Sequence, residues 1–105
     1  MSKPKISFTP NATFKATVDI PVAGAAAIPV EFTFKFRPKT ELKEWSSQLD
    51  GVEDLDLVKD MAVGWELEEK FSDENLNKLF EIYIGAPTAI FRTYVREQHG
   101  AKLGN

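Results

Sequence analysis

The feature that most constrains the fold of this chain is a change in the spacing of its apolar residues. Before residue 37, apolar and polar side chains alternate along two stretches, 14–20 and 30–36. A period of two gives a strand one buried face and one solvated face. From residue 40 onward, apolar residues recur three and four positions apart, which is the period of an amphipathic helix. The sequence therefore predicts two strands followed by a helical part.

The two predicted strands are close neighbours in the sequence, which favours an antiparallel β-hairpin over residues 13–37. The segment between them, 21–29, reads PVAGAAAIP and carries no charge. Because proline has no N–H to donate to a strand ladder, we expect the pairing to be interrupted at Pro21 and at Pro29. The segment is interpreted as a long loop of small residues, which is either a plain hairpin tip or an adaptable contact element.

The remaining part, 38–100, is predicted to contain about four short helices. Thr40 is a candidate cap for the first helix, which is expected to end near Gly51. The second is expected to run from about Glu53 to Met61 or beyond, with several acidic residues at its beginning, where the helix dipole favours them. The segment that follows, VGWELEEKF, is interpreted as a helix end or a connector.

The last two helices have the clearest signals. Ser72 is a cap for the third helix, Gly85 ends it, and Pro87 suits the first turn of the fourth. The third helix carries a complete apolar stripe: Leu76, Leu79, Phe80, Tyr83 and Ile84. Because the connection between the two helices is so short, we expect them to form an antiparallel helical hairpin. The predicted fold class is α+β, with the β-hairpin packed on the helices, and the pattern also allows a third strand.

A chain of 105 residues suits a single domain, which we expect over residues 13–105. Residues 1–12 contain two prolines and no apolar period, so they are predicted to be a flexible arm. No apolar run is long enough to cross a bilayer, and no apolar stretch of a secretory signal follows the N-terminal lysines. We therefore expect no membrane partner.

The sequence offers few groups for catalysis or for binding a metal. It has no cysteine, and its one histidine, His99, lies near the end of the chain. The acidic segment 50–56, DGVEDLD, lacks the spacing of a calcium-binding loop. The basic residues are too scattered for a nucleic-acid platform. We therefore expect no enzyme activity, no metal, no cofactor and no nucleic-acid partner.

Charge is distributed unevenly along the chain. Residues 41–81 carry thirteen acidic residues and four lysines, a net charge of −9, although the whole chain carries −3. A segment of this kind either forms a solvated helical surface that keeps the protein soluble or fits a basic surface on a partner. The second reading leaves open a different function, that of a small acidic inhibitor that binds a basic surface of another protein.

The segment VKDMAVGWELEEKFSDENLNKLFEIYIGAPTAIFRTYVREQ resembles the small tail assembly chaperones of long-tailed bacteriophages and prophages. The marks are Gly64-Trp65 after an amphipathic helix, FSDENL at 71–76, and an aromatic–Gly-Ala turn that leads into AIFRTY at 89–94. The segment FRPKTELKEW, which follows the predicted hairpin, is also similar to that group. The resemblance covers approximately residues 28–98. One departure is Ile84, where many relatives have a proline before the glycine.

The resemblance implies a non-catalytic protein that acts in the cytoplasm of the bacterial host. Its implied partner is the tape-measure protein, a long and largely helical chain that such chaperones keep soluble until tail-tube subunits polymerise around it. Self-association, the tail-tube protein and a frameshifted longer form of the chain itself are further partners of the kind that the family implies. Two rival interpretations remain: a small acidic phage-encoded inhibitor that binds a basic surface of a host protein, and a structural component retained in the virion.

Four aromatic side chains are candidates for the partner-binding surface: Trp65, Phe71, Phe91 and Tyr94. Large aromatic residues are frequent anchors of protein interfaces, but they are equally frequent in cores. Both interpretations remain open at this point. Trp45 lies on the apolar stripe of its own helix, so we expect it in the core.

Overall fold

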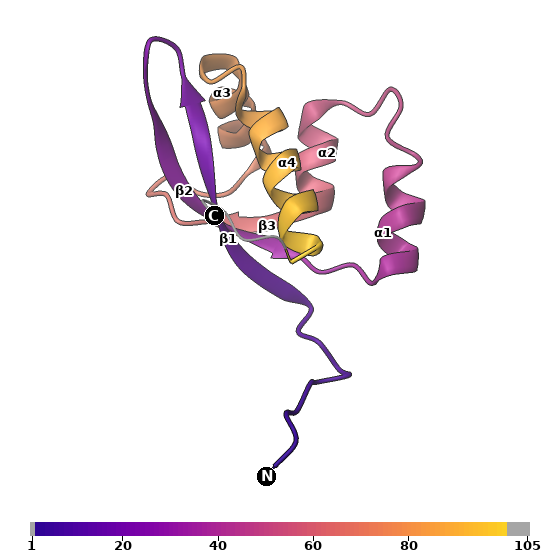
Figure 1. Cartoon of the computed structure of the whole chain (residues 1–105). Helices are drawn as coiled ribbons and strands as arrows, with labels where there is room; N and C mark the ends of the chain where they lie inside the picture. The colour runs from indigo at the N-terminus through magenta and orange to yellow at the C-terminus, as the bar shows by residue number, and fades with distance from the viewer. Residues whose placement is uncertain (1, 101–105) are drawn as a thin grey trace.

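The computed structural model describes residues 2–100 and has an α+β architecture in which helices pack on a three-stranded sheet (Figure 1). The strands are β1 (Thr13–Val22), β2 (Ala25–Lys35) and β3 (Ala62–Trp65). The helices are α1 (Lys39–Ser46), α2 (Asp54–Met61), α3 (Asp73–Ile82) and α4 (Ala86–Gln98). The predicted fold class is confirmed. The last five residues of the predicted domain, 101–105, lie outside the described residues.

The sheet is antiparallel throughout, in the order β1-β2-β3, and the alternation in the sequence decides which side chains are buried. Val18 pairs with Val30 and Ala16 pairs with Phe32, and all four side chains point to the core face. The intervening residues lie on the other face, where Lys15 and Glu31 form an ion pair at 3.8 Å between their Nζ and Oε1 atoms. The helices therefore cover one face of the sheet, and the other face contacts solvent.

The hairpin is longer than expected, and the predicted loop over residues 21–29 is wrong. β1 continues to Val22 and β2 begins at Ala25, so the strands are joined by only Ala23 and Gly24. Gly24 has a φ of 72°, a value that glycine adopts without strain and that lets the chain turn within two residues. Pro29 is accommodated in the ladder opposite Asp19, and the register shifts by one residue beside Pro21, as in a β-bulge.

The third strand lies where the sequence predicted a helix end or a connector. Ala62 pairs with Phe34 and Trp65 pairs with Phe32, so the short β3 extends the sheet beside β2. Helix α1 also differs from the expectation. It ends at Ser46, before Gly51, and Thr40 lies inside the helix, so no side chain caps its beginning at Pro38. The predicted cap of α3 is confirmed: the Oγ atom of Ser72 accepts a hydrogen bond of 3.3 Å from the backbone N–H of Asn75.

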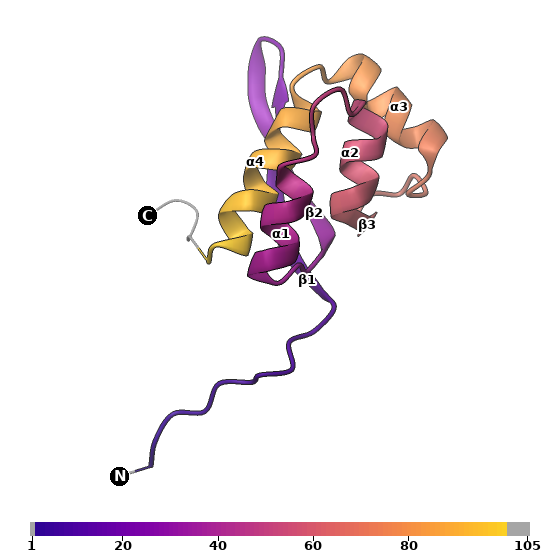
Figure 2. The same ribbon diagram turned by 90° about the vertical axis from the view of Figure 1, so that its right-hand side faces the viewer.

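Helix α4 packs along β1 and against α2, and α3 packs against α2 with a smaller contact to α4 (Figures 1 and 2). The connection between α3 and α4 approaches β1 closely beside the register shift. A Cβ atom added at Gly85 would lie 3.2 Å from the Cγ atom of Pro21. Glycine at this position therefore allows the α3–α4 turn to rest on the hairpin, which brings α3 alongside the distal part of β1 and β2.

Candidate functional site

The side chains of the hairpin, of α3 and of the loop between them enclose an apolar groove of about 360 Å³, which we call the hairpin–α3 groove. Its apolar lining consists of Ile20, Ile28, Val30, Trp65, Leu67, Leu79, Ile82 and Tyr83. Three polar residues complete the lining: Glu69, Asn75 and Lys78. Pockets that bind partners or ligands are commonly concave and mostly apolar with a few polar groups. The hairpin–α3 groove is therefore the candidate functional site.

Trp65 lines the groove at the end of β3, and three contacts hold its ring in place. The indole packs edge-on against Phe32 of the core, with ring centroids 5.9 Å apart, and against Phe71, at 5.2 Å. Its Nε1–H donates a hydrogen bond of 2.7 Å to the backbone carbonyl of Glu69. The loop 66–72 therefore folds back around the indole, and the groove has a preformed wall.

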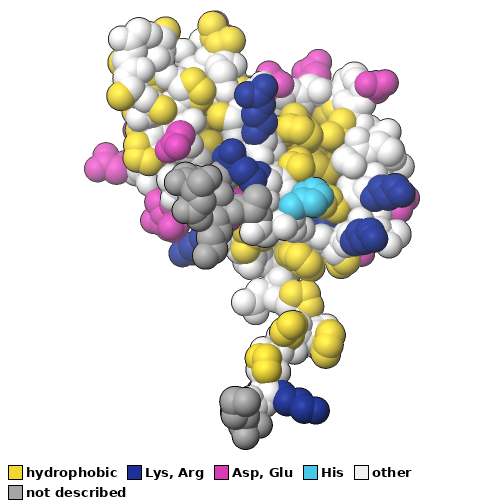
Figure 3. Space-filling model, viewed as in Figure 1, with side chains coloured by type: hydrophobic (Ala, Val, Ile, Leu, Met, Phe, Trp, Pro, Cys, Tyr) yellow, Lys and Arg dark blue, Asp and Glu magenta, His cyan; other side chains and the backbone are white. Residues whose placement is uncertain are grey.

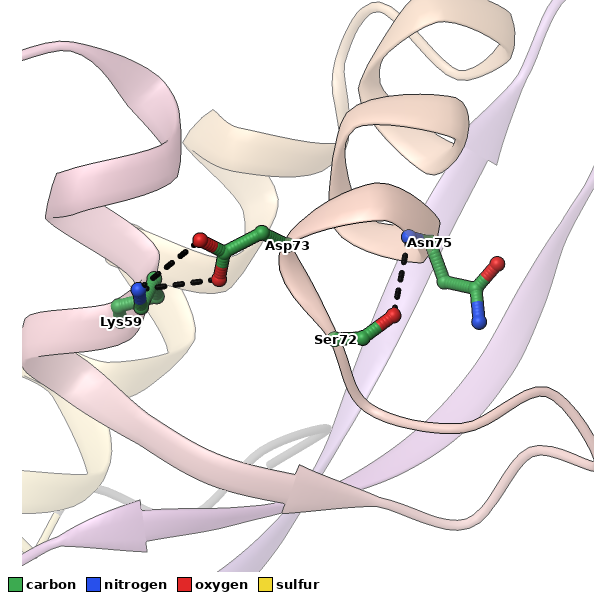
Figure 4. A network of polar contacts seen from close by, with 4 residues as sticks. All are labelled: Lys59, Ser72, Asp73 and Asn75. Carbon is green, nitrogen blue, oxygen red and sulfur yellow. Dashed lines mark hydrogen bonds and ion pairs between the residues drawn. The ribbon is translucent and has the colours of Figure 1, made fainter.

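Helix α3 forms the opposite wall, and its first turn is tied to α2 (Figure 4). The Nζ atom of Lys59 lies 2.9 Å from one carboxylate oxygen of Asp73 and 3.2 Å from the other. Ser72 caps the helix, and the fully buried Leu76 anchors it to the core. With one face of α3 fixed in this way, Leu79 and Ile82 face the groove.

Several apolar side chains of the groove are open to solvent. Ile82 is 70% exposed, Ile28 is 45% exposed and Leu67 is 37% exposed. Apolar surface in water is unfavourable by roughly 25 cal/mol per Å², and contiguous apolar patches on soluble proteins commonly mark interaction surfaces. The groove is thus suited to receive an apolar segment of another polypeptide.

The structure divides the four predicted binding residues between two places. Trp65 lines the groove, and Phe71 packs behind it. Phe91 and Tyr94 lie instead around Trp45 of α1, with ring centroids 6.2 and 5.5 Å from the Trp45 ring. The binding roles of all four residues remain predictions, but only Trp65 and Phe71 are located at the groove.

Tyr94 is fully buried, and its hydroxyl group is part of a core network. The hydroxyl donates a hydrogen bond of 2.9 Å to the carbonyl of Lys35 and accepts one of 2.9 Å from the Nη1 atom of Arg37. Burial raises the pKa of the Tyr94 phenol above its ordinary value, and the hydrogen bond and charge of Arg37 partly oppose this. The guanidinium also lies over the Trp45 ring, 4.6 Å from its centroid. This arrangement gives Tyr94 no exposed area for direct contact with a partner.

Three of the most exposed groove residues, Ile28, Leu67 and Ile82, were not among the predicted binding residues. The sequence contained a signal that Ile82 is exposed: it is an apolar residue of the third helix that does not belong to the predicted apolar stripe. Ile84 was assigned to that stripe, but α3 ends at Ile82, and Ile84 lies in the following turn with 86% of its surface exposed. Ile84 also lies outside the groove lining.

Within residues 2–100, no group of three or more histidine, cysteine, aspartate or glutamate side chains is arranged to hold a metal ion. Among the described helices, none combines the length and the apolar character needed to span a bilayer. The groove offers shape and apolar surface, with Glu69 and Lys78 as its charged lining residues.

Comparison with known proteins agrees with the resemblance noted from the sequence. A family model described as phage tail assembly chaperone matches residues 1–105. Neither the curated proteins nor the solved structures contain a match to the chain. The family match extends over the hairpin and the arm as well as over the helical segment in which the sequence motifs lie. This chain therefore belongs to the phage tail assembly chaperone family.

Proposed function

We propose that the protein binds the tape-measure protein of its phage through the hairpin–α3 groove and keeps that protein soluble during tail assembly. The proposed site of action is the cytoplasm of the bacterial host. The observation that carries the proposal is an open apolar groove in a chain that belongs to the tail assembly chaperone family. The tail-tube protein and a frameshifted longer form of the chain are proposed as further partners.

The geometry of the groove fits one face of an amphipathic helix. Such helices bind by laying side chains at positions i, i+3, i+4 and i+7 into an apolar groove. A largely helical client would supply this face, and Ile82 and Ile28 would cover it from two sides. Because the part of the groove around Trp65 is held by ring contacts and a hydrogen bond, little ordering is needed when the client binds.

The acidic surface complements this role. Residues 41–81 carry a net charge of −9, and most of the acidic side chains are exposed. A densely charged, exposed segment opposes aggregation, so a complex between this chain and an apolar client would remain dispersed. Binding to the free client would also shift it away from self-association by mass action.

The proposal is tested by co-expressing the chain with the tape-measure protein of the same phage and measuring how much of the latter stays soluble and is captured. Ile82→Ser is the decisive variant, because the exposed side chain contributes little to folding. Loss of its apolar atoms from a filled groove is expected to cost about 2 kcal/mol, which weakens binding roughly thirtyfold. Ile84→Ser is the matched control, because Ile84 is exposed but lies outside the groove.

Trp65→Ala is a complementary variant that must be read together with circular dichroism, since Trp65 also packs on Phe32. Equal capture by wild type, Ile82→Ser and Ile84→Ser would contradict the proposed groove, and failure of the wild type to capture the client would contradict the function. Capture through apolar contact is expected to persist when salt is added. Capture that disappears with salt would instead support binding of the acidic surface to a basic protein.

A further inference from the structure

The N-terminal arm, residues 2–12, extends away from the sheet (Figures 1 and 2). It carries two large exposed apolar side chains. Phe8 is 94% exposed and Ile6 is 79% exposed. One backbone hydrogen bond ties the end of the arm to the end of the hairpin: the N–H of Phe36 donates to the carbonyl of Ala12, at 2.8 Å. Figure 3 shows apolar side chains along the projecting arm, where no other described segment covers them. The arm therefore presents an uncovered apolar segment.

The arm is complementary in charge to the rim of the groove. Lys3 and Lys5 are its charged side chains within residues 2–12, and that range contains no acidic residue. The loop 66–72, which contributes Leu67 and Glu69 to the groove, carries three glutamates and one lysine. In an extended conformation, residues two positions apart point to the same side, so an arm that straightens at its bend on docking can place Ile6 and Phe8 in one groove together. Opposite charges at the rim would set the orientation of the arm.

The arm cannot place Phe8 at the distal end of the groove of its own chain. One end of the groove, at Trp65, is level with Ala16, but the distal end lies at Ile20 and Ile28. Thr13 begins β1, and the seven strand residues from Thr13 to Ile20 span about 23 Å. The five residues from Phe8 to Thr13 reach at most about 18 Å when fully extended. The hydrogen bond of 3.2 Å from the N–H of Thr9 to the Oγ atom of Ser7 shortens the arm further. An arm that fills the distal end of the groove must therefore come from another molecule.

We propose that the arm of one copy, with Ile6 and Phe8, docks in the hairpin–α3 groove of a second copy of this chain. This pairing covers the groove when no client is present. A part of the inference rests on the proposed function: because the groove is also the proposed client site, the client and the neighbouring arm compete for it. Self-association and client capture are then alternative states of one surface.

The first test measures self-association of the full chain, without any client, by sedimentation velocity over a wide range of concentration. The double substitution Ile6→Ser with Phe8→Ser removes the apolar arm residues, which make no core contact, and is expected to weaken self-association about tenfold or more. Ile82→Ser, on the groove side, is expected to act in the same direction. Ile84→Ser is the control and is expected to self-associate as the wild type does.

The second test locates the arm. A photoreactive benzophenone amino acid replaces Phe8 in chains that are mixed from isotopically labelled and unlabelled protein, so that cross-links between copies are distinguished from those within one copy. Cross-links between copies to the segments around Ile28 and Ile82 are expected. Cross-links to the free edge of β1, cross-links within one copy, or a wild-type chain that stays monomeric would each overturn the proposal.

Client capture separates this proposal from the proposed function. If the arm variant self-associates weakly and captures more tape-measure protein than the wild type, both proposals are supported. If it self-associates weakly but neither it nor the wild type captures the client, arm docking stands and the proposed client does not. If self-association is unchanged in the arm variant, arm docking is overturned whatever the client does.

Discussion

Replacing Tyr94 by phenylalanine distinguishes a core role from a binding role for this residue. The substitution removes one hydroxyl group and leaves the ring, which packs 5.4 Å from Phe34 and 5.5 Å from Trp45. It removes two hydrogen bonds of 2.9 Å, one to the carbonyl of Lys35 and one from Arg37. Arg37 is only half-buried and can bind water instead. The main loss of stability is therefore expected from the carbonyl of Lys35, which loses its hydrogen-bond donor.

The expected loss of unfolding free energy is about 1–2 kcal/mol, within the usual cost of leaving a buried polar group without its partner. For a domain of about 100 residues, each kcal/mol corresponds to a shift in Tm of roughly 4–8 °C. Urea unfolding followed by circular dichroism measures the change, as a lower midpoint with an unchanged slope. Tyr83→Phe is the matched control. Its ring is half-buried, its hydroxyl has no protein partner within the described residues, and it is expected to change stability by less than about 0.5 kcal/mol.

The pH dependence gives a second readout of the same hydroxyl. Burial raises the pKa of Tyr94 in the folded state, despite the opposing effect of Arg37. The neutral phenol is therefore favoured by folding, and its contribution to stability is fully present below the pKa of an unfolded tyrosine, about 10. That contribution is lost as the pH rises through the higher pKa of the folded state. The difference in urea midpoint between wild type and Tyr94→Phe is expected to shrink above about pH 10.

Equal stability of wild type and Tyr94→Phe at neutral pH would refute the assignment of Tyr94 to a core network. Client capture provides the complementary measurement. We expect Tyr94→Phe to capture tape-measure protein as well as the wild type does at a temperature where both are folded. A selective loss of capture, with stability unchanged, would return Tyr94 to the binding surface.

Three further predictions concern stability, and urea unfolding measures each. Ser72→Ala removes the cap of α3 and is expected to cost about 1 kcal/mol, whereas Ser72→Thr, which keeps the hydroxyl, should cost only a few tenths; equal costs would contradict a role for the hydroxyl. Leu76→Ala leaves a cavity in the core and should cost about 2–5 kcal/mol, while Ile84→Ala, at an exposed site, should change stability by less than about 0.5 kcal/mol. Gly24→Ala forces a side chain into a φ of 72° and should cost about 1–2 kcal/mol, but Gly64→Ala, which meets no neighbouring atom within 4 Å and has no positive φ, should cost much less.

The sequence by itself determined the features that depend on neighbours a few residues away. Alternation predicted which residues of the hairpin face the core, and Val18, Phe32 and Phe34 are fully buried. The caps and breaks of the last two helices were equally local, so Ser72 and Pro87 were placed correctly. Such signals are readable because strand and helix periods act along one segment of chain.

Only the tertiary structure decided where the apolar surface remains open. β3 has four residues, and its pairing with Phe32 and Phe34 joins segments about thirty positions apart, which no local period reveals. The hairpin–α3 groove depends on long-range packing: the α3–α4 turn passes close to Pro21 at Gly85, and Ile28 lies in a paired strand where the sequence predicted a long loop. Trp65 and Tyr94 look alike as aromatic residues in helical surroundings, yet one lines the groove and the other is enclosed by the core. The exposed fraction of such a side chain depends on which distant segments pack over it. Only the tertiary structure determines that packing.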